Sequence, residues 1–174
     1  MSLDEGDNDP TRFWVYVVQA LRTVEPSVGT AALAALHRTG ADLYRAVLPS
    51  LHSELSAVGS RLVLVLDDYH VVTNATCHQT LAFFLDNLPA GVHVVLSTRA
   101  DPALPLARMR ARGELVELRA AELRFTDEEA SALLNGSMGL QLPTDDVERL
   151  AERTEGWAAA LYLAGLSLRG REDA

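Results

Sequence analysis

The chain has 174 residues, of which 48% are hydrophobic, and this length suits one domain or one domain with a small appendage. Its formal charge of −9 argues against a surface that docks as a whole on nucleic acid or anionic lipid, because neutralising phosphates needs a local excess of cations. The one cysteine, Cys77, cannot form an intrachain disulfide. No apolar stretch approaches the ~18 residues of a membrane span, and the acidic start is unlike a signal peptide. We therefore expect a soluble, cytoplasmic protein.

The first third of the chain is expected to be helical. Asp9 and Pro10 are typical of a helix start, and apolar residues then recur at helical spacing as far as Val24. We interpret residues 2–5, just before this helix, as the tail of a strand whose body lies upstream. A second apolar stripe runs from residue 43 to residue 58, and Pro49 within it is expected to kink or split that helix.

Two aliphatic runs predict parallel strands. Residues 61–67 contain the run LVLVL, which favours a strand that is buried on both faces in the middle of a parallel sheet. Residues 93–98 predict a second buried strand, and the apolar spacing over 81–88 predicts a helix between the two. Because such a unit takes a right-handed crossover, both strands should end at the same edge of the sheet.

A change of pattern divides the chain. A short helix over 106–112 leads to a third strand candidate at 114–118, and from about residue 122 the pattern is wholly helical. The sequence therefore predicts an α/β fold, with a sheet subdomain over 1–121 and a helical subdomain over 122–174 that resembles a lid.

The helical part carries clear start signals. Thr126 begins a capping box, Thr144 is expected to cap a further helix, and Gly156 with Trp157 is expected to open the last apolar helix. Gly156 and Trp157 could also bring a ring or a backbone group near a nucleotide that lies between sheet and lid. A capped helix start with a core tryptophan is the structural alternative.

Two adjacent carboxylates, Asp67 and Asp68, follow the first aliphatic run. They are costly to bury, but they suit a crevice with hydrated Mg²⁺ and a nucleotide phosphate, which is where open α/β sheets bind ligands. We interpret Asp67 as the group that holds the metal through water, Asp68 as the group that orients the attacking water, and Arg99 after the second strand as the contact to the γ-phosphate. A strand that ends in a solvated loop would leave the same pattern.

The usual companion of such a strand end is G-x-x-x-x-G-K-[ST], whose lysine reaches the phosphates. All 15 basic residues of this chain are arginine. Three of these, Arg108, Arg110 and Arg112, lie close together and could contact an anion or a partner, although a solvated basic face explains them as well. Tyr69 and His70 could line the strand-end crevice or serve packing alone. The chain therefore looks like part of a nucleotide-binding protein.

Several strings of the sequence resemble one family. They are LVLVLDDYH, VVLSTRADPALPLARMRARGEL, LRFTDEEASALL, RTEGWAAALYLAGLSL and the opening SLDEGDNDPTRFW. In this order they are similar to the nucleotide-binding region of MalT-like, LuxR-type transcriptional regulators, a branch of the STAND ATPases. The resemblance covers essentially the whole chain.

This resemblance implies a partial P-loop NTPase sheet of the ASCE/STAND type, which lacks its first strand and P-loop and is followed by a helical lid. It implies ATP or ADP with Mg²⁺ between sheet and lid, and a nucleotide that switches inducer-dependent oligomerisation. Asp67 and Asp68 would form Walker B, and Arg99 would be the sensor 1 arginine. The parent would be a slow ATPase, whereas this chain, without Walker A, is expected to be inactive and to bind no nucleotide.

The chain also departs from the family. Walker A lies upstream, and the inducer-binding repeats and the DNA-binding helix-turn-helix lie downstream, so contacts with DNA and with a small-molecule inducer are expected outside this chain. The Gly-x-Pro motif of the lid falls on Gly156, Trp157 and Ala158, without its proline. The missing first strand leaves 114–118 without its neighbour, so we expect a rearranged or intermolecularly paired sheet, and hence self-association.

Two other functions remain open from the sequence. A stand-alone metal-dependent phosphohydrolase could use Asp67 and Asp68, but it needs at least one further ligand, for which Asp101 is the obvious candidate. A non-catalytic protein-interaction module would make the acidic strand end incidental.

Overall fold

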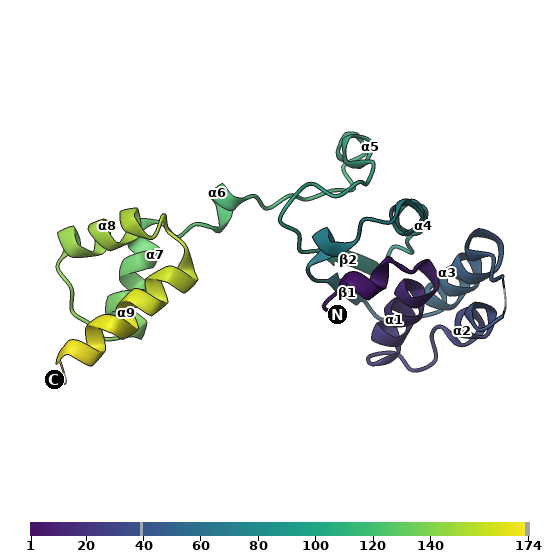
Figure 1. Cartoon of the computed structure of the whole chain (residues 1–174), viewed down its shortest axis with the longest axis horizontal. Helices are drawn as coiled ribbons and strands as arrows, with labels where there is room; N and C mark the ends of the chain where they lie inside the picture. Colours follow the sequence, from purple (N-terminus) through teal and green to yellow (C-terminus); the bar gives the residue numbers. More distant parts are fainter. Residues whose placement is uncertain (39, 173–174) are drawn as a thin grey trace. The chain divides into compact units, whose positions relative to one another are not determined.

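The computed structural model describes residues 1–38 and 40–172, and the chain forms two compact units (Figure 1). The first unit is Met1–Met109 and the second is Arg110–Ala174. The sequence predicts a boundary between residues 121 and 122, and the division between the two compact units lies after Met109. None of the helices in these described residues is long and apolar enough to cross a membrane.

The first unit packs short helices around a small sheet. Its elements in chain order are a 3-10 helix Glu5–Asn8, α1 Pro10–Arg22, α2 Thr30–Leu36, a π-helix Leu43–Val47, α3 Leu48–Ser56, β1 Leu62–Leu66, a 3-10 helix Tyr69–Val71, α4 Ala75–Asp86 and β2 Val92–Leu96. The boundary between the units falls within the next helix, α5 Leu106–Ala111. The predicted α/β class and strand, helix, strand unit are confirmed. Pro49 lies in the first turn of α3, directly after a π-helix that continues into it without a break, so the predicted kink or split takes the form of a change of helix type.

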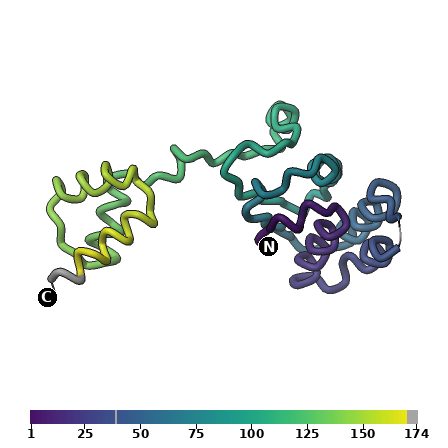
Figure 2. The backbone as a smooth tube through the Cα atoms, viewed as in Figure 1, coloured from purple at the N-terminus to yellow at the C-terminus, as the bar shows by residue number. Residues whose placement is uncertain are grey.

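The sheet has two strands, β1 and β2, which pair in parallel from Leu62 opposite Val92 to Leu66 opposite Leu96. On the other side of β1, Ser2 pairs in parallel with Asp67, and the backbone N–H of Leu3 donates to the carbonyl of Asp67 at 3.0 Å. The purple N-terminus therefore lies beside the end of β1 (Figure 2). The predicted strand tail over residues 2–5 is present as this one bridge.

β1 is not buried on both faces, and this part of the prediction is wrong. Its residues alternate between buried and exposed, and Val63 is 61% exposed while its neighbour Leu64 is 3% exposed. Leu62, Leu64 and Leu66 face the helices and join the core, whereas the opposite face carries Val63 and Val65 toward solvent. The sequence run cannot reveal this, because it specifies an apolar strand but not whether both faces are covered.

The core of the first unit is built around α1. Asp9 accepts a hydrogen bond from the backbone of Arg12 and Pro10 occupies the first turn, as predicted. Trp14 is fully buried and meets the ring of Phe84 on α4 edge to face, with centroids 5.3 Å apart. Val24 is 74% exposed, because the helix ends at Arg22 before its apolar stripe does.

The second unit is helical throughout its regular structure. It contains α6 Ala120–Leu123, α7 Asp127–Ser131, a π-helix Ala132–Ser137, α8 Thr144–Arg153 and α9 Ala158–Glu172. All of these helices except α6 contribute to a core, which contains Ala130, Leu134, Met138, Leu140, Val147, Ala151 and Leu161. The Thr126 capping box is present, but Thr144 is the first helical residue and Pro143 holds the N-cap position, so the predicted Thr144 cap is wrong.

The third strand candidate does not form. Residues 114–119 have no regular structure, Val116 is 88% exposed and Leu118 is 69% exposed. A strand needs a neighbour to satisfy its backbone N–H and C=O groups, and no strand lies beside this segment within the described residues. The propensity of the segment is therefore overridden by the lack of a pairing partner.

Candidate functional site

The strand-end acids lie where β1 and β2 stop together. The backbone N–H of Ser97 donates to the carbonyl of Leu66 at 3.0 Å, and that of Tyr69 donates to the carbonyl of Ser97 at 2.9 Å. These two bonds extend the contact between the strands past Asp67 and Asp68. Asp68 has φ 58° and ψ 35°, in the left-handed region that aspartate tolerates better than most residues, so the chain turns sharply at the second acid.

The carboxylate of Asp67 is exposed and electrostatically stabilised. A hydrogen bond from the Ser97 side chain lowers the pKa of Asp67 most, and the backbone N–H of Asp68, 3.1 Å from Oδ1, lowers it further. The positively charged N-terminus and His70 act in the same direction. Asp67 is therefore ionised at neutral pH and offers the hard oxygen donors that Mg²⁺ prefers.

Arg99 follows β2 by three residues and is exposed. Because β1 and β2 are parallel and in register, Arg99 emerges at the same edge of the sheet as Asp67 and Asp68. No hydrogen bond or ion pair joins Arg99 to either acid within residues 1–38 and 40–172. The three predicted residues thus lie at one edge of the sheet, and the guanidinium of Arg99 is not paired with the carboxylate of Asp67 or Asp68.

A complete metal cage is not built at this edge. The part of the chain that the structure describes contains no group of three or more His, Cys, Asp or Glu side chains arranged to hold a metal ion. Asp101, which the hydrolase alternative needs as a further ligand, does not complete such a group. Asp67 and Asp68 instead fit the sparse coordination typical of hydrated Mg²⁺, in which waters and substrate phosphates supply most ligands.

Tyr69 and His70, which follow the acids, face different surroundings. Tyr69 is 1% exposed, and its hydroxyl lies 2.8 Å from Nδ1 of His78 on α4, so it anchors the turn in the core. Burial raises the pKa of Tyr69 and lowers that of His78, which keeps both neutral at pH 7. Nδ1 of His70 lies 3.8 Å from Oδ1 of Asp68. Tyr69 thus serves packing, and only His70 faces the acids.

Gly156 and Trp157 belong to the second unit. Gly156 has φ 71°, and its carbonyl accepts a hydrogen bond of 2.7 Å from the backbone N–H of Phe125. A Cβ at this position would lie 2.8 Å from the carbonyl oxygen of Phe125, so only glycine fits without movement. Trp157 is 44% exposed and immediately precedes α9. Gly156 therefore has a local structural role, whereas the exposed ring of Trp157 does not complete the core that the sequence also allowed.

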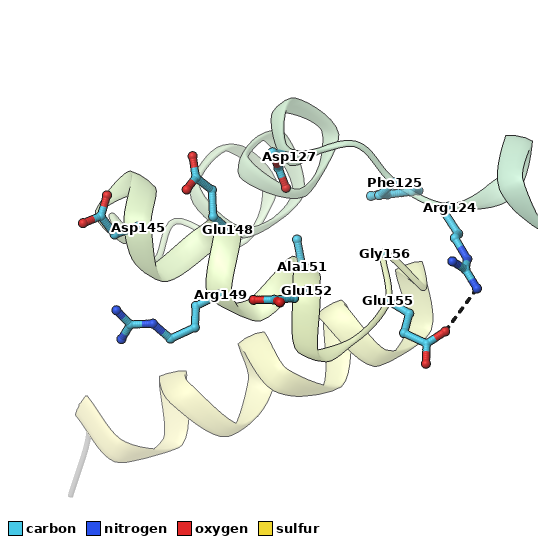
Figure 3. Close-up of a pocket in the computed structure, with 10 residues that line it drawn as sticks. All are labelled: Arg124, Phe125, Asp127, Asp145, Glu148, Arg149, Ala151, Glu152, Glu155 and Gly156. Carbon is cyan, nitrogen blue, oxygen red and sulfur yellow. Dashed lines mark hydrogen bonds and ion pairs between the residues drawn. The ribbon is translucent and has the colours of Figure 1, made fainter.

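An open hollow of about 750 Å³ lies beside Gly156 in the second unit (Figure 3). Its lining is dominated by five acids and two arginines: Asp127, Asp145, Glu148, Glu152, Glu155, Arg124 and Arg149. Arg124 pairs with Glu155 at 3.1 Å, which leaves an excess of negative charge. A nucleotide phosphate would be repelled here, so we do not place the nucleotide in this hollow. Sequence reasoning missed it, although three acids on one face of α8 were visible.

The arginine cluster is engaged with acids. Arg108 pairs with Asp86 at 2.5 Å, and Arg110 pairs with Glu117 at 2.7 Å. Arg112 lies 4.0 Å from Glu114. These pairs favour a solvated, locally neutralised surface over a free anion site.

The fold is thus a small parallel α/β unit with two acids at the end of one strand and an arginine beyond the next, joined to a separate helical unit. No protein-family model matches the chain. A serine/threonine-protein kinase named PknK from Mycobacterium tuberculosis is 38% identical over all 174 residues. A MalT transcriptional regulator of the HTH type from Serratia proteamaculans is 36% identical over 170 residues, and one from Klebsiella pneumoniae is 33% identical over 168.

These alignments cover 97% to 100% of this chain. The chain spans only 16% of the length of PknK and 19% of that of each MalT. The predicted resemblance is confirmed, because the chain is a homologue of a segment found in MalT-type transcriptional regulators and in PknK. The MalT relatives are named as transcriptional regulators, and PknK is named as a protein kinase.

Proposed function

We propose that the chain is part of the nucleotide-binding region of a MalT-like, LuxR-type transcriptional regulator of the STAND P-loop ATPase class, in which ATP or ADP acts as an oligomerisation switch. One observation carries this proposal. The in-register pairing of β1 with β2 brings Asp67, Asp68 and Arg99 to one edge of a parallel sheet, which is where open α/β sheets bind ligands.

Each residue has a role that fits its surroundings. Asp67, exposed and with a lowered pKa, is suited to Mg²⁺ through water. Asp68, which lies at a sharp turn with a left-handed backbone, would orient an attacking water, and Arg99 would contact the γ-phosphate. When bound, Mg²⁺ would supply charge neutralisation for the phosphates. Of the two residues that the sequence places near the nucleotide, Trp157 is exposed and stays a proposed contact, whereas Gly156 lines the acidic hollow and keeps its local structural role.

The pair of relatives supports a regulatory module. A protein named as a kinase and proteins named as transcriptional regulators share this segment, yet it makes up less than a fifth of each. Because the same segment occurs in a protein named as a kinase and in proteins named as transcriptional regulators, it is better suited to regulating its parent protein than to phosphorylation or DNA binding. Contacts with DNA and with an inducer would then lie elsewhere in the parent, and self-association would involve the open sheet of β1 and β2.

Calorimetric titration tests the proposal. We expect Mg²⁺-ATP and Mg²⁺-ADP to bind weakly or not at all to the 174-residue chain, and tightly to a longer form that includes the sequence preceding Met1 in its gene. In the longer form, Asp67→Asn and Arg99→Ala should each weaken binding by at least tenfold. Arg61→Ala is the matched control, because Arg61 precedes the opposite, amino end of β1.

The same titration separates the alternatives. A phosphohydrolase that uses Asp101 as a further ligand would lose metal binding in Asp101→Asn, which the nucleotide switch should tolerate. An interaction module would bind no nucleotide in either form. If the longer form contains no G-x-x-x-x-G-K-[ST] and binds no nucleotide, the proposal is wrong.

A further inference from the structure

The turn after β1 places a histidine against the second acid. Asp68 adopts the left-handed conformation, and the N–H of Val71 donates to the carbonyl of Asp68 at 3.1 Å, which closes a single 3-10 turn over Tyr69–Val71. Tyr69 fixes this turn from the inside, through its backbone bond to Ser97 and its hydroxyl contact with His78. Three contacts therefore hold the turn in place. Because His70 lies within this turn, they also fix the position of its backbone.

One ring nitrogen of His70 has no partner. Nδ1 is buried and makes no hydrogen bond to any of the described residues, while Oδ1 of Asp68 lies 3.8 Å away. A buried, unsatisfied ring nitrogen is unfavourable. A shift of roughly 1 Å would bring the two atoms to the 2.7–3.2 Å of a normal hydrogen bond. The side chain of Asp68 is 42% exposed, so it has room to make that shift.

We propose that His70 is a positioning residue for Asp68: its Nδ1–H donates to the carboxylate and fixes the orientation of that carboxylate at the end of β1. This proposal rests on the proposed function, because it assigns a partner to the acid that orients water there. The bond requires the neutral ring to carry its proton on Nδ1. His78 provides a comparison in the same unit, because its Nδ1 lies 2.8 Å from the Tyr69 hydroxyl, and a hydroxyl that donates there leaves the ring proton on Nε2.

Proton-detected ¹⁵N spectra of the histidine rings test this in the 174-residue chain itself. In these spectra we expect His70 in the Nδ1–H form and His78 in the Nε2–H form. Asp68→Gly removes the acceptor but keeps a residue that accepts φ 58°, and it should move His70 to the Nε2–H form without affecting His78. Asp68→Asn, which also tolerates this backbone and keeps an acceptor oxygen, should preserve the Nδ1–H form.

A second measurement uses the longer, nucleotide-binding form. His70→Ala should slow ATP hydrolysis about tenfold, because the carboxylate that orients the attacking water is then no longer held in place. His70→Asn, whose amide nitrogen occupies the place of Nδ1, should restore the rate to within about threefold, whereas His70→Gln should not. A role in folding alone would not distinguish these two amides.

The two proposals fail differently. If the longer form binds no nucleotide, the proposed function is wrong, but the ring spectra still decide the His70–Asp68 bond. If His70 has its proton on Nε2 in the unaltered chain, averages between both forms, or is unchanged by Asp68→Gly, the positioning role is overturned even where nucleotide binds.

Discussion

Asn8 and Thr73 are 65 residues apart in the chain and are joined by two hydrogen bonds: Oδ1 of Asn8 accepts from the backbone N–H of Thr73 at 2.7 Å and from its hydroxyl at 3.1 Å. The same oxygen accepts from the backbone N–H of Asn74 at 2.9 Å. On its other side, Nδ2 of Asn8 donates to the carbonyl of Val71 at 2.9 Å and to that of Glu5 at 3.0 Å. One amide thus fixes the loop that connects the strand-end acids to α4.

Asn8→Ala should destabilise the first unit by about 2–4 kcal/mol, because it removes several bonds worth roughly 1 kcal/mol each and leaves partly buried backbone groups unpaired. Asn8→Asp keeps the acceptor and loses the donors, so its effect should be intermediate. Urea unfolding measures both. Asn87→Ala is the control, because the Asn87 amide donates only to the Phe83 carbonyl in an exposed setting, and a loss comparable to that of Asn8→Ala would contradict this role.

A second buried bond joins α1 to α4. The indole Nε1–H of Trp14 donates to the hydroxyl oxygen of Thr80 at 3.0 Å, and both side chains are completely buried. Thr80→Val keeps the shape but leaves the indole N–H unsatisfied, so we expect a loss of about 1–3 kcal/mol in the free energy of unfolding. Thr80→Ser, which keeps the hydroxyl, should lose less. Equal losses in the two variants would assign the effect to packing rather than to the hydrogen bond.

Local signals explain what the sequence could predict. Asp9 with Pro10, and Thr126 with Glu129, satisfy the first N–H groups of their own helices, so their effect depends on a few neighbouring residues. The edge that gathers Asp67, Asp68 and Arg99 was also predictable, because two strands joined by a helix run parallel and therefore end at the same edge of the sheet.

Distant partners explain what the sequence could not predict. The exposure of Val63 depends on what covers the second face of the sheet, and the strand at 114–118 depends on a neighbour that is not among the described residues. The contacts of Asn8 and His70 also went unforeseen. Asn8 bonds residues more than 60 positions away, and the orientation of the His70 ring depends on a left-handed residue that no spacing rule marks.

Gly156 allows backbone strain and steric conflict to be separated. Gly156→Ala combines a left-handed backbone with a methyl group 2.8 Å from the Phe125 carbonyl, so we expect it to destabilise the second unit by about 2–5 kcal/mol. Gly139→Ala shares a positive φ of 72° but has open space around it, and should lose only about 1–2 kcal/mol.

Gly136→Ala, with neither problem, should be neutral or stabilising by up to about 1 kcal/mol. Amide hydrogen exchange, resolved by residue, measures the second unit separately from the first. Equal effects of Gly156→Ala and Gly139→Ala would show that the approach to Phe125 does not matter.

Glu117 provides a pH-dependent contact in the second unit. Hydrogen bonds from Arg110, 2.7 Å away, and from Arg119 lower the pKa of Glu117 from its ordinary 4.5 to about 2. Because the folded pKa of Glu117 is depressed, the contact stabilises the folded segment above pH 4.5 and is lost as the pH falls from 4.5 toward 2.

Carboxyl ¹³C NMR should therefore show Glu117 titrating near pH 2. Arg110→Gln and Arg119→Gln should each move that midpoint upward, whereas Arg124→Gln, whose arginine pairs with Glu155 instead, should leave it unchanged. A Glu117 midpoint near 4.5 in the unaltered chain would mean that water screens these pairs and that residues 110–119 are not held by them.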